Sequence, residues 1–231
     1  PVTITADIDY RETPVSTHRL DLFVANTGVA PVEGQYFPTI IYAHGGGFVY
    51  GSRKDGGPVK FCKEMASRGY NAISMEYPLI ASNAYVPITT ETNATASMHD
   101  VIRWANQFKD TYFIDVNKIV VAGDSAGGCM AVMAAIANFE ASGAHSSYAA
   151  HVGKRPAAVL DFWGPTQIFG LPLGGSPFTT NIAAGNANKV LMVHGSSDMT
   201  VTPDHSYALK WIIETYGPSA KPILRALAGA E

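Results

Sequence analysis

The chain has 231 residues, of which 47% are hydrophobic, so it can bury one substantial core and we predict a single domain over residues 1–231. The net charge is −3 and only 15% of the residues are charged, which argues against a partner that is a nucleic acid or an anionic membrane. No apolar run reaches the roughly 18 residues that a membrane span needs.

The ends and the composition of the chain indicate a compartment. The sequence begins at Pro1 rather than Met, so we expect that a leader has been removed. The low charge content then favours an extracellular or periplasmic protein, while a cytoplasmic one stays open. The two cysteines, Cys62 and Cys129, fall in predicted helices, and we favour buried thiols over one disulfide.

The first third of the chain predicts two alternating strands, a buried strand and a helix–strand pair. The expected elements are strands Ile4–Tyr10 and His18–Ala25, strand Thr39–Ala43, a helix from about Pro58 to Arg68, and strand Asn71–Tyr77. The run Thr39–Ala43 is continuously apolar, as in a parallel strand that is buried on both faces, and it leads directly into His44-Gly45-Gly46-Gly47-Phe48.

The rest of the chain continues to alternate helices and strands. We expect an irregular loop over Pro78–Asn93, helix Thr95–Phe108, strand Ile119–Ala122, helix Ala126–Phe139, a loop over Ser142–Pro156, strand Ala157–Trp163, a small lid over Gly164–Asn188, strand Lys189–His194, helix Asp204–Tyr216 and strand Pro222–Leu227. This order predicts a mainly parallel sheet with right-handed crossovers.

The motif Gly123-Asp124-Ser125-Ala126-Gly127-Gly128 follows a β-branched strand and opens an apolar helix. Strand, sharp turn and helix are the setting of a nucleophile elbow, in which the flanking glycines let strand and helix approach each other. The same pattern also suits a glycine-rich turn that binds phosphate. Two further polar stretches, His44–Gly47 and His194–Asp198, follow predicted strands, and all three are expected at one edge of the sheet.

Five segments together resemble the esterases similar to hormone-sensitive lipase, within the α/β-hydrolase superfamily. They are His44-Gly45-Gly46-Gly47-Phe48, Tyr77-Pro78-Leu79, Ile114-Asp115-Val116-Asn117-Lys118-Ile119, Gly123–Gly128 and His194-Gly195-Ser196-Ser197-Asp198. The resemblance implies an α/β-hydrolase fold: a mostly parallel sheet of about eight strands flanked by helices. Many of these esterases carry an N-terminal cap, but we expect little or no cap here, because only about 36 residues precede the first core strand.

The resemblance also implies the roles of individual residues. Ser125 would be the nucleophile, the backbone N–H groups of Gly46, Gly47 and Ala126 would form the oxyanion hole, and Asp198 would orient the base histidine. Asp198 also suits an ordinary turn residue in a Ser-Ser-Asp loop. No cofactor is implied, and no cluster of residues has the spacing of metal ligands.

The base histidine is not evident. The superfamily order is Ser, then Asp, then His, and only His205 follows Asp198, at the start of a predicted helix where it is poorly placed. The resemblance puts the base on the loop after the last strand, so we expect it beyond Glu231; otherwise the protein lacks a base. We interpret His44 and His194 as structural residues that hold loops through ring hydrogen bonds.

The predicted function is a serine carboxylic-ester hydrolase that acts through an acyl-enzyme on a small-molecule or polymer-attached ester, such as acetyl or feruloyl groups on plant polysaccharide. The alternative is a non-catalytic ligand-binding protein on an esterase scaffold, as in the plant gibberellin receptors. A peptidase or lactonase with the same triad is not separated by sequence. Trp163 is a candidate pocket residue because it ends a core strand. The sequence does not indicate an oligomeric state.

Overall fold

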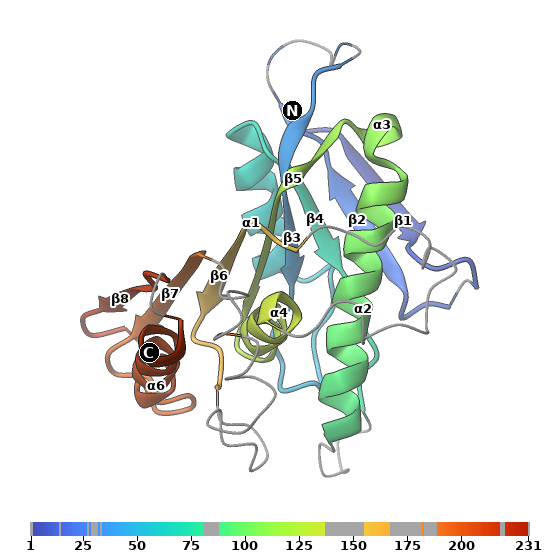
Figure 1. Ribbon diagram of the computed structural model, residues 1–231. Helices are drawn as coiled ribbons and strands as arrows, with labels where there is room; N and C mark the ends of the chain where they lie inside the picture. Colours follow the sequence, from blue (N-terminus) through green and yellow to red (C-terminus); the bar gives the residue numbers. More distant parts are fainter. Residues whose placement is uncertain are drawn as a thin grey trace.

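A twisted sheet is the centre of the molecule (Figure 1). The computed structural model describes residues 2–13, 15–26, 28, 32, 34–80, 88–136, 155–166, 182, 189–217 and 220–230. Within this part eight strands form one sheet, in the order β1-β2-β4-β3-β5-β6-β7-β8. The strands are β1 Ile4–Asp9, β2 Arg19–Phe23, β3 Phe37–Ala43, β4 Asn71–Met75, β5 Ile114–Asp124, β6 Ala158–Phe162, β7 Lys189–Gly195 and β8 Ile223–Leu227.

Strand direction confirms the predicted fold class. β1 pairs antiparallel with β2, and β2 pairs antiparallel with β4. From β4 to β8 every neighbouring pair is parallel. The carboxyl ends of β3, β5, β6, β7 and β8 therefore meet at one edge of the sheet, where α/β proteins bind ligands.

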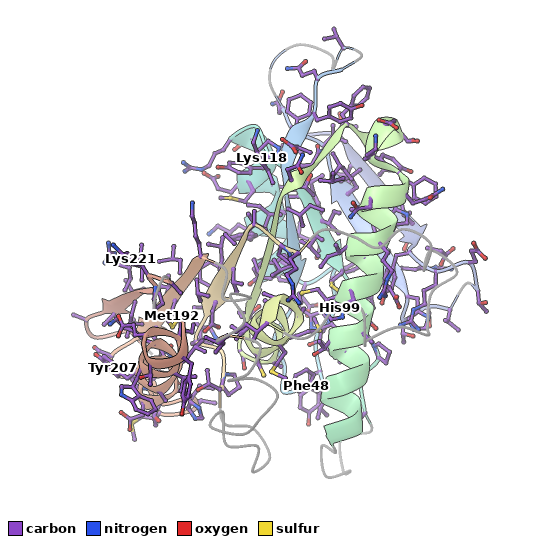
Figure 2. The ribbon with its side chains drawn as sticks, in the orientation of Figure 1. Phe48, His99, Lys118, Met192, Tyr207 and Lys221 are labelled. Carbon is purple, nitrogen blue, oxygen red and sulfur yellow. The ribbon has the colours of Figure 1, made fainter. Side chains whose placement is uncertain are left out.

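Helices cover both faces of this sheet (Figure 1). The described helices are α1 Gly56–Ser67, α2 Ile88–Gln107, α3 Lys109–Tyr112, α4 Ala126–Ile136 and α6 Asp204–Tyr216. Helices α2 and α4 pack on one face and on each other, whereas α1 packs against β3 and β4 from the other face. Figure 2 shows that side chains fill the space between these layers.

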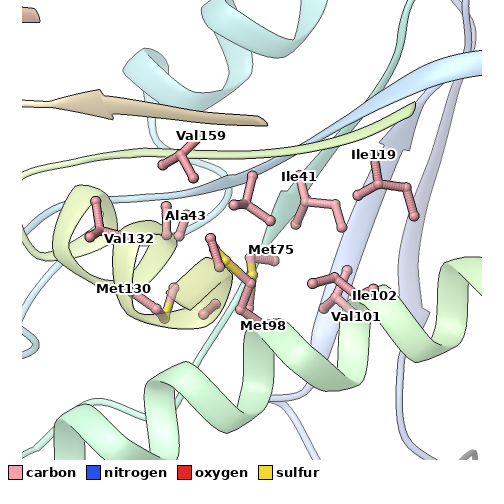
Figure 3. Close-up of a cluster of buried hydrophobic side chains, with 14 of the residues drawn as sticks. Ile41, Ala43, Met75, Met98, Val101, Ile102, Ile119, Met130, Val132 and Val159 are labelled. Atoms are coloured by element: carbon pink, nitrogen blue, oxygen red, sulfur yellow. The ribbon is translucent and has the colours of Figure 1, made fainter. Parts of the chain in front are cut away.

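The side chains of β3 show why its sequence is apolar throughout. Ile41 and Ala43 belong to the larger core, with Met98 of α2 and Met130 of α4, as Figure 3 shows. Ile40 and Tyr42 belong to the smaller core on the side of α1. Successive strand residues point to opposite faces, so burial of both faces requires a continuous apolar run.

The structure departs from the prediction mainly at three places. Helix α2 begins at Ile88, inside the segment 78–93 that was predicted to be irregular, because its Thr-rich start carries no apolar period of 3.6 residues. Helix α3 was not predicted, and β5 begins at Ile114 rather than Ile119. Most of the predicted loop over 142–156 and lid over 164–188 lies outside the described residues.

The remaining expectations concern the cysteines and membranes. Cys62 and Cys129 are both buried and form no disulfide, as predicted. Among the described helices, none combines the length and the apolar character needed to cross a membrane.

Candidate active site

The segments that suggest chemistry in the sequence meet at the carboxyl edge of the sheet. Ala43 at the end of β3 pairs with Gly123 in β5, and Phe162 at the end of β6 pairs with Asp124 and Val193. The serine turn that follows β5 therefore has the loop after β3 on one side. On its other side lie the turns that follow β6 and β7.

Ser125 stands at the tip of a tight turn between β5 and α4. Its φ angle is 50°, a left-handed conformation that is unfavourable for a residue with a side chain. The N–H of Ser125 donates to the carbonyl oxygen of Phe162 at 2.9 Å, and its own carbonyl accepts from the N–H of Cys129 at 3.0 Å. Ser125 is partly exposed. These contacts hold the serine in a strained position at the edge of the sheet.

The glycines that flank Ser125 are required by close approach of backbone to backbone. A Cβ atom at Gly123 would lie 2.4 Å from the carbonyl carbon of Gly127, and one at Gly127 would lie 2.1 Å from the carbonyl oxygen of Ala43. Both distances are far below van der Waals contact. The structure thus confirms that strand, turn and helix meet only because these positions lack side chains.

The segment Gly45–Gly47, here called the glycine loop, lies against this turn. The N–H of Gly45 donates to Oδ1 of Asp124 at 3.1 Å, and the hydroxyl of Tyr42 donates to the same oxygen at 2.7 Å. The φ angles of Gly46 and Gly47 are 112° and 62°. Within the described residues the N–H groups of these two glycines donate to no protein acceptor, so they are free to bind an anion at the turn.

Asp198 lies in the turn that follows β7 and is nearly buried, with 8% of its surface exposed. Its Oδ1 accepts the N–H groups of Thr200 and Val201 at 2.8 and 2.9 Å, so Asp198 does act as a turn residue. Its Oδ2 lies 3.7 Å from Nε2 of His194. The turn holds Asp198 through one oxygen and leaves the other with this long contact.

The described histidines near the sheet edge contact groups other than Ser125. His44 contacts the carbonyl of Gly45 and the carboxylate of Glu76. His194 contacts the carbonyl of Val201 and the hydroxyl of Ser206, both at 2.7 Å. These contacts confirm that both rings hold loops.

His205 does not reach the serine turn. Its Nδ1 accepts the N–H of Thr166 at 3.1 Å, and burial lowers the pKa of its ring. His145 and His151 lie outside the described residues. Within the described part, the structure brings no histidine to Ser125.

The end of β8 runs beside the Asp198 turn. The N–H of Ser196 donates to the carbonyl of Leu227 at 2.9 Å, and the N–H of Ser197 donates to the carbonyl of Ala230, also at 2.9 Å. In return, the N–H of Gly229 donates to the hydroxyl of Ser196 at 3.1 Å. The residues just after β8 are therefore tied to the loop that carries Asp198.

Asp161 in β6 is a buried carboxyl that the sequence did not single out. Its Oδ1 accepts the N–H of Gly164 at 2.9 Å, whereas its buried Oδ2 has no partner within the described residues. A Cβ at Gly128 in α4 would lie 2.4 Å from Oδ1, so the carboxyl packs under the start of the helix. Burial raises the pKa of Asp161 to about 7.

Metal binding finds no support in this part of the chain. Among the described residues there is no group of three or more histidine, cysteine, aspartate or glutamate side chains that could hold an ion.

The fold and the serine turn together define an α/β-hydrolase. The chain belongs to the BD-FAE family, which matches residues 21–184. The resemblance to the esterases similar to hormone-sensitive lipase is thereby confirmed.

A curated relative agrees with this assignment, and solved structures share the fold. The chain is 30% identical over 155 residues to the carboxylesterase NlhH of Mycobacterium tuberculosis, which covers 67% of this chain and 42% of that protein. It thus spans about two fifths of the length of this curated relative. A truncated carbohydrate esterase from gut microbiota superposes with a TM-score of 0.78 at 17% identity, over 99% of this chain and 88% of the other. The native Est2 esterase of Thermogutta terrifontis gives a TM-score of 0.74 at 18% identity, over 99% and 82%.

Proposed function

We propose that the protein is a serine carboxylic-ester hydrolase that acts through an acyl-enzyme. The observation that carries the proposal is the strained, partly exposed Ser125, with φ 50°, beside the N–H groups of Gly46 and Gly47, which donate to no acceptor within the described residues. Backbone strain of this kind is concentrated at functional sites, which supports a functional role for the serine. Family membership and the carboxylesterase relative support the same conclusion.

In this mechanism Oγ of Ser125 attacks the ester carbonyl, and the negative charge that develops on the carbonyl oxygen is bound by backbone N–H groups. Gly46, Gly47 and Ala126 are proposed to supply them, because the glycine loop and the first turn of α4 lie side by side. Loss of one such donor typically costs about 2.7–4 kcal/mol in the activation barrier. The alcohol leaves, and water then releases the acyl group from Ser125.

Asp198 is the proposed acid of the triad, and its base is proposed to be a histidine that follows Glu231. The order of the triad in this superfamily supports this placement. The hydrogen bonds between Ser197 and Ala230 and between Gly229 and Ser196 support it too, because they direct the chain after β8 past the Asp198 turn.

The proposed substrates are acetyl or feruloyl esters on polysaccharide. One solved structure of the same fold is described as a carbohydrate esterase, which supports this class. Trp163 supports it as well, because it follows β6 next to the serine turn with 37% of its surface exposed and can stack on a sugar or an aromatic acyl group. Such polymers lie outside the cytoplasm, which agrees with the expected extracellular or periplasmic location.

The test is hydrolysis of p-nitrophenyl acetate by two proteins, the chain as printed and the chain with the residues that follow Glu231. We expect the longer protein to turn over faster by orders of magnitude and Ser125→Ala to abolish turnover. If the longer protein is as inert as Ser125→Ala, the non-catalytic binding protein becomes the better interpretation. Hydrolysis of p-nitrophenyl esters without release of acetate or ferulate from substituted xylan would refute the substrate class alone.

A further inference from the structure

A chain of buried polar contacts links the glycine loop to charged residues that the proposed mechanism does not use. It begins at His44, whose ring is almost fully buried. Nδ1 of His44 lies 2.7 Å from the carbonyl oxygen of Gly45, the first residue of the glycine loop, and Nε2 lies 3.1 Å from Oε1 of Glu76. The ring of His44 therefore bridges the loop after β3 and the residue that follows β4.

The other oxygen of Glu76 is held just as firmly. Its Oε2 accepts from the hydroxyl of Ser52 at 3.2 Å and from Nη1 of Arg53 at 3.3 Å. Arg53 is itself only 5% exposed and is also paired with Asp7 and Asp21. Burial of a guanidinium is costly unless it is paired, so these carboxylates fix Arg53, and Arg53 in turn fixes Glu76.

The partners of His44 determine how its ring is held. A carbonyl oxygen only accepts, so Nδ1 must carry a proton. The one proton of the neighbouring Tyr77 hydroxyl goes to the carbonyl oxygen of His44 at 2.7 Å and does not compete. Burial raises the pKa of the Glu76 carboxyl, but hydrogen bonds from His44, Arg53 and Ser52 outweigh it and hold that pKa below its ordinary value, so Glu76 faces the ring as a carboxylate. The ring of His44 is thereby held between the carboxylate of Glu76 and the carbonyl oxygen of Gly45.

This arrangement acts directly on the groups proposed to bind the oxyanion. The carbonyl of Gly45 belongs to the same peptide unit as the N–H of Gly46, so the direction of that carbonyl sets the direction of that N–H. A ring that holds the carbonyl of Gly45 thereby holds the N–H of Gly46. Gly46 has no room to compensate, because its Cα lies so close to Tyr50 that a Cβ would be 2.2 Å from the Tyr50 carbonyl oxygen.

We propose that Glu76, fixed by Arg53 and Ser52, is a positioning residue that acts through the His44 ring to aim the N–H groups of the glycine loop. The inference rests on the proposed ester hydrolysis for its kinetic consequence, but its structural part does not depend on turnover. In this proposal Glu76 acts on the oxyanion-binding N–H groups only through the ring of His44.

The structural test compares ¹H–¹⁵N spectra of Glu76→Gln and a control variant, Glu64→Gln. Glu64 is matched because it also pairs with an arginine, Arg68 at 2.7 Å, but on the exposed surface of α1. We expect the amide resonances of Gly46 and Gly47 to shift or split in Glu76→Gln and to stay in place in Glu64→Gln. Unchanged Gly46 and Gly47 resonances in Glu76→Gln would overturn the proposal.

The kinetic test separates positioning from simple charge balance. In the protein that hydrolyses p-nitrophenyl acetate, Glu76→Gln is expected to lower kcat by about 10- to 100-fold and to leave KM within about twofold, because only transition-state binding is impaired. Glu76→Asp keeps the charge beside Arg53, so it preserves the buried ion pair, but it is too short to hold His44 as well. It should therefore also lose kcat.

Full kcat in Glu76→Asp, or a rise in KM with unchanged kcat in Glu76→Gln, would refute positioning. If the wild-type protein hydrolyses no ester, the proposed function fails. The spectra of Gly46 and Gly47 then decide this inference alone.

Discussion

Replacement of Gly127 by alanine tests the close approach that builds the serine turn. The new Cβ would lie 2.1 Å from the carbonyl oxygen of Ala43 and 2.7 Å from the carbonyl oxygen of His44. Both atoms are backbone, so no side-chain rotation can make room. The end of β3 and the start of α4 must move apart, and the glycine loop must move with them.

The expected magnitude follows from two opposing terms. Alanine is favoured over glycine in a helix by up to about 1 kcal/mol. Overpacking in a dense region costs about 1–3 kcal/mol, and contacts with rigid backbone belong at the upper end. We therefore expect the free energy of unfolding to fall by about 1–2 kcal/mol. The matched control is Gly57→Ala in α1, where a Cβ meets nothing within 4 Å and should add about 0.4–1 kcal/mol.

The assay is equilibrium unfolding in urea, followed by far-UV circular dichroism, with comparison of midpoints at constant slope. Ester hydrolysis by Gly127→Ala should fall as well, because the glycine loop no longer lies against Ser125. If Gly127→Ala is as stable as Gly57→Ala, the argument from close approach is refuted.

Two further predictions use the strain and the buried acid at the same edge. Ser125→Gly should have a free energy of unfolding about 1 kcal/mol higher than that of Ser125→Ala, because glycine adopts φ 50° without strain. Both variants should abolish hydrolysis. Equal stability of the two variants in urea would argue against stored strain. Asp161, whose pKa is raised to about 7 in the folded protein, stabilises the fold fully below its unfolded pKa near 3.8 and loses that contribution as pH rises toward and through 7. Urea unfolding should be measured for the wild type and for Asp161→Asn between pH 4 and pH 8. Over this range the free energy of unfolding of the wild type should fall by up to about 4 kcal/mol more than that of Asp161→Asn. Parallel pH profiles of the two proteins would contradict a buried neutral acid.

Local signals account for the elements that were predicted well. Helix α6 spans Asp204–Tyr216, as predicted, because its apolar residues recur at helical spacing and its ends carry turn residues. The start of α2 at Ile88 was missed because its Thr-rich first turns contain no such period. A helix there depends on the rest of α2, which packs on β5 and α4.

The parts of the candidate site that depend on backbone conformation were predictable from the amino-acid sequence. Ser125, with Gly123 and Gly127, and the glycine loop were recognised because tight turns and close approaches demand specific residue types at fixed spacing. These conformational requirements are local, so they can be recognised from a few neighbouring residues.

The charged side chains that support the candidate site became evident only from the fold. Asp124 binds Tyr42 and Gly45 across a separation of about 80 residues, and Glu76 joins His44 to Arg53 from the end of a different strand. Asp161 packs under a helix that begins 35 residues before it. Nothing near these residues in the sequence marks their partners, because pairing of buried charges is set by the order of strands in the sheet.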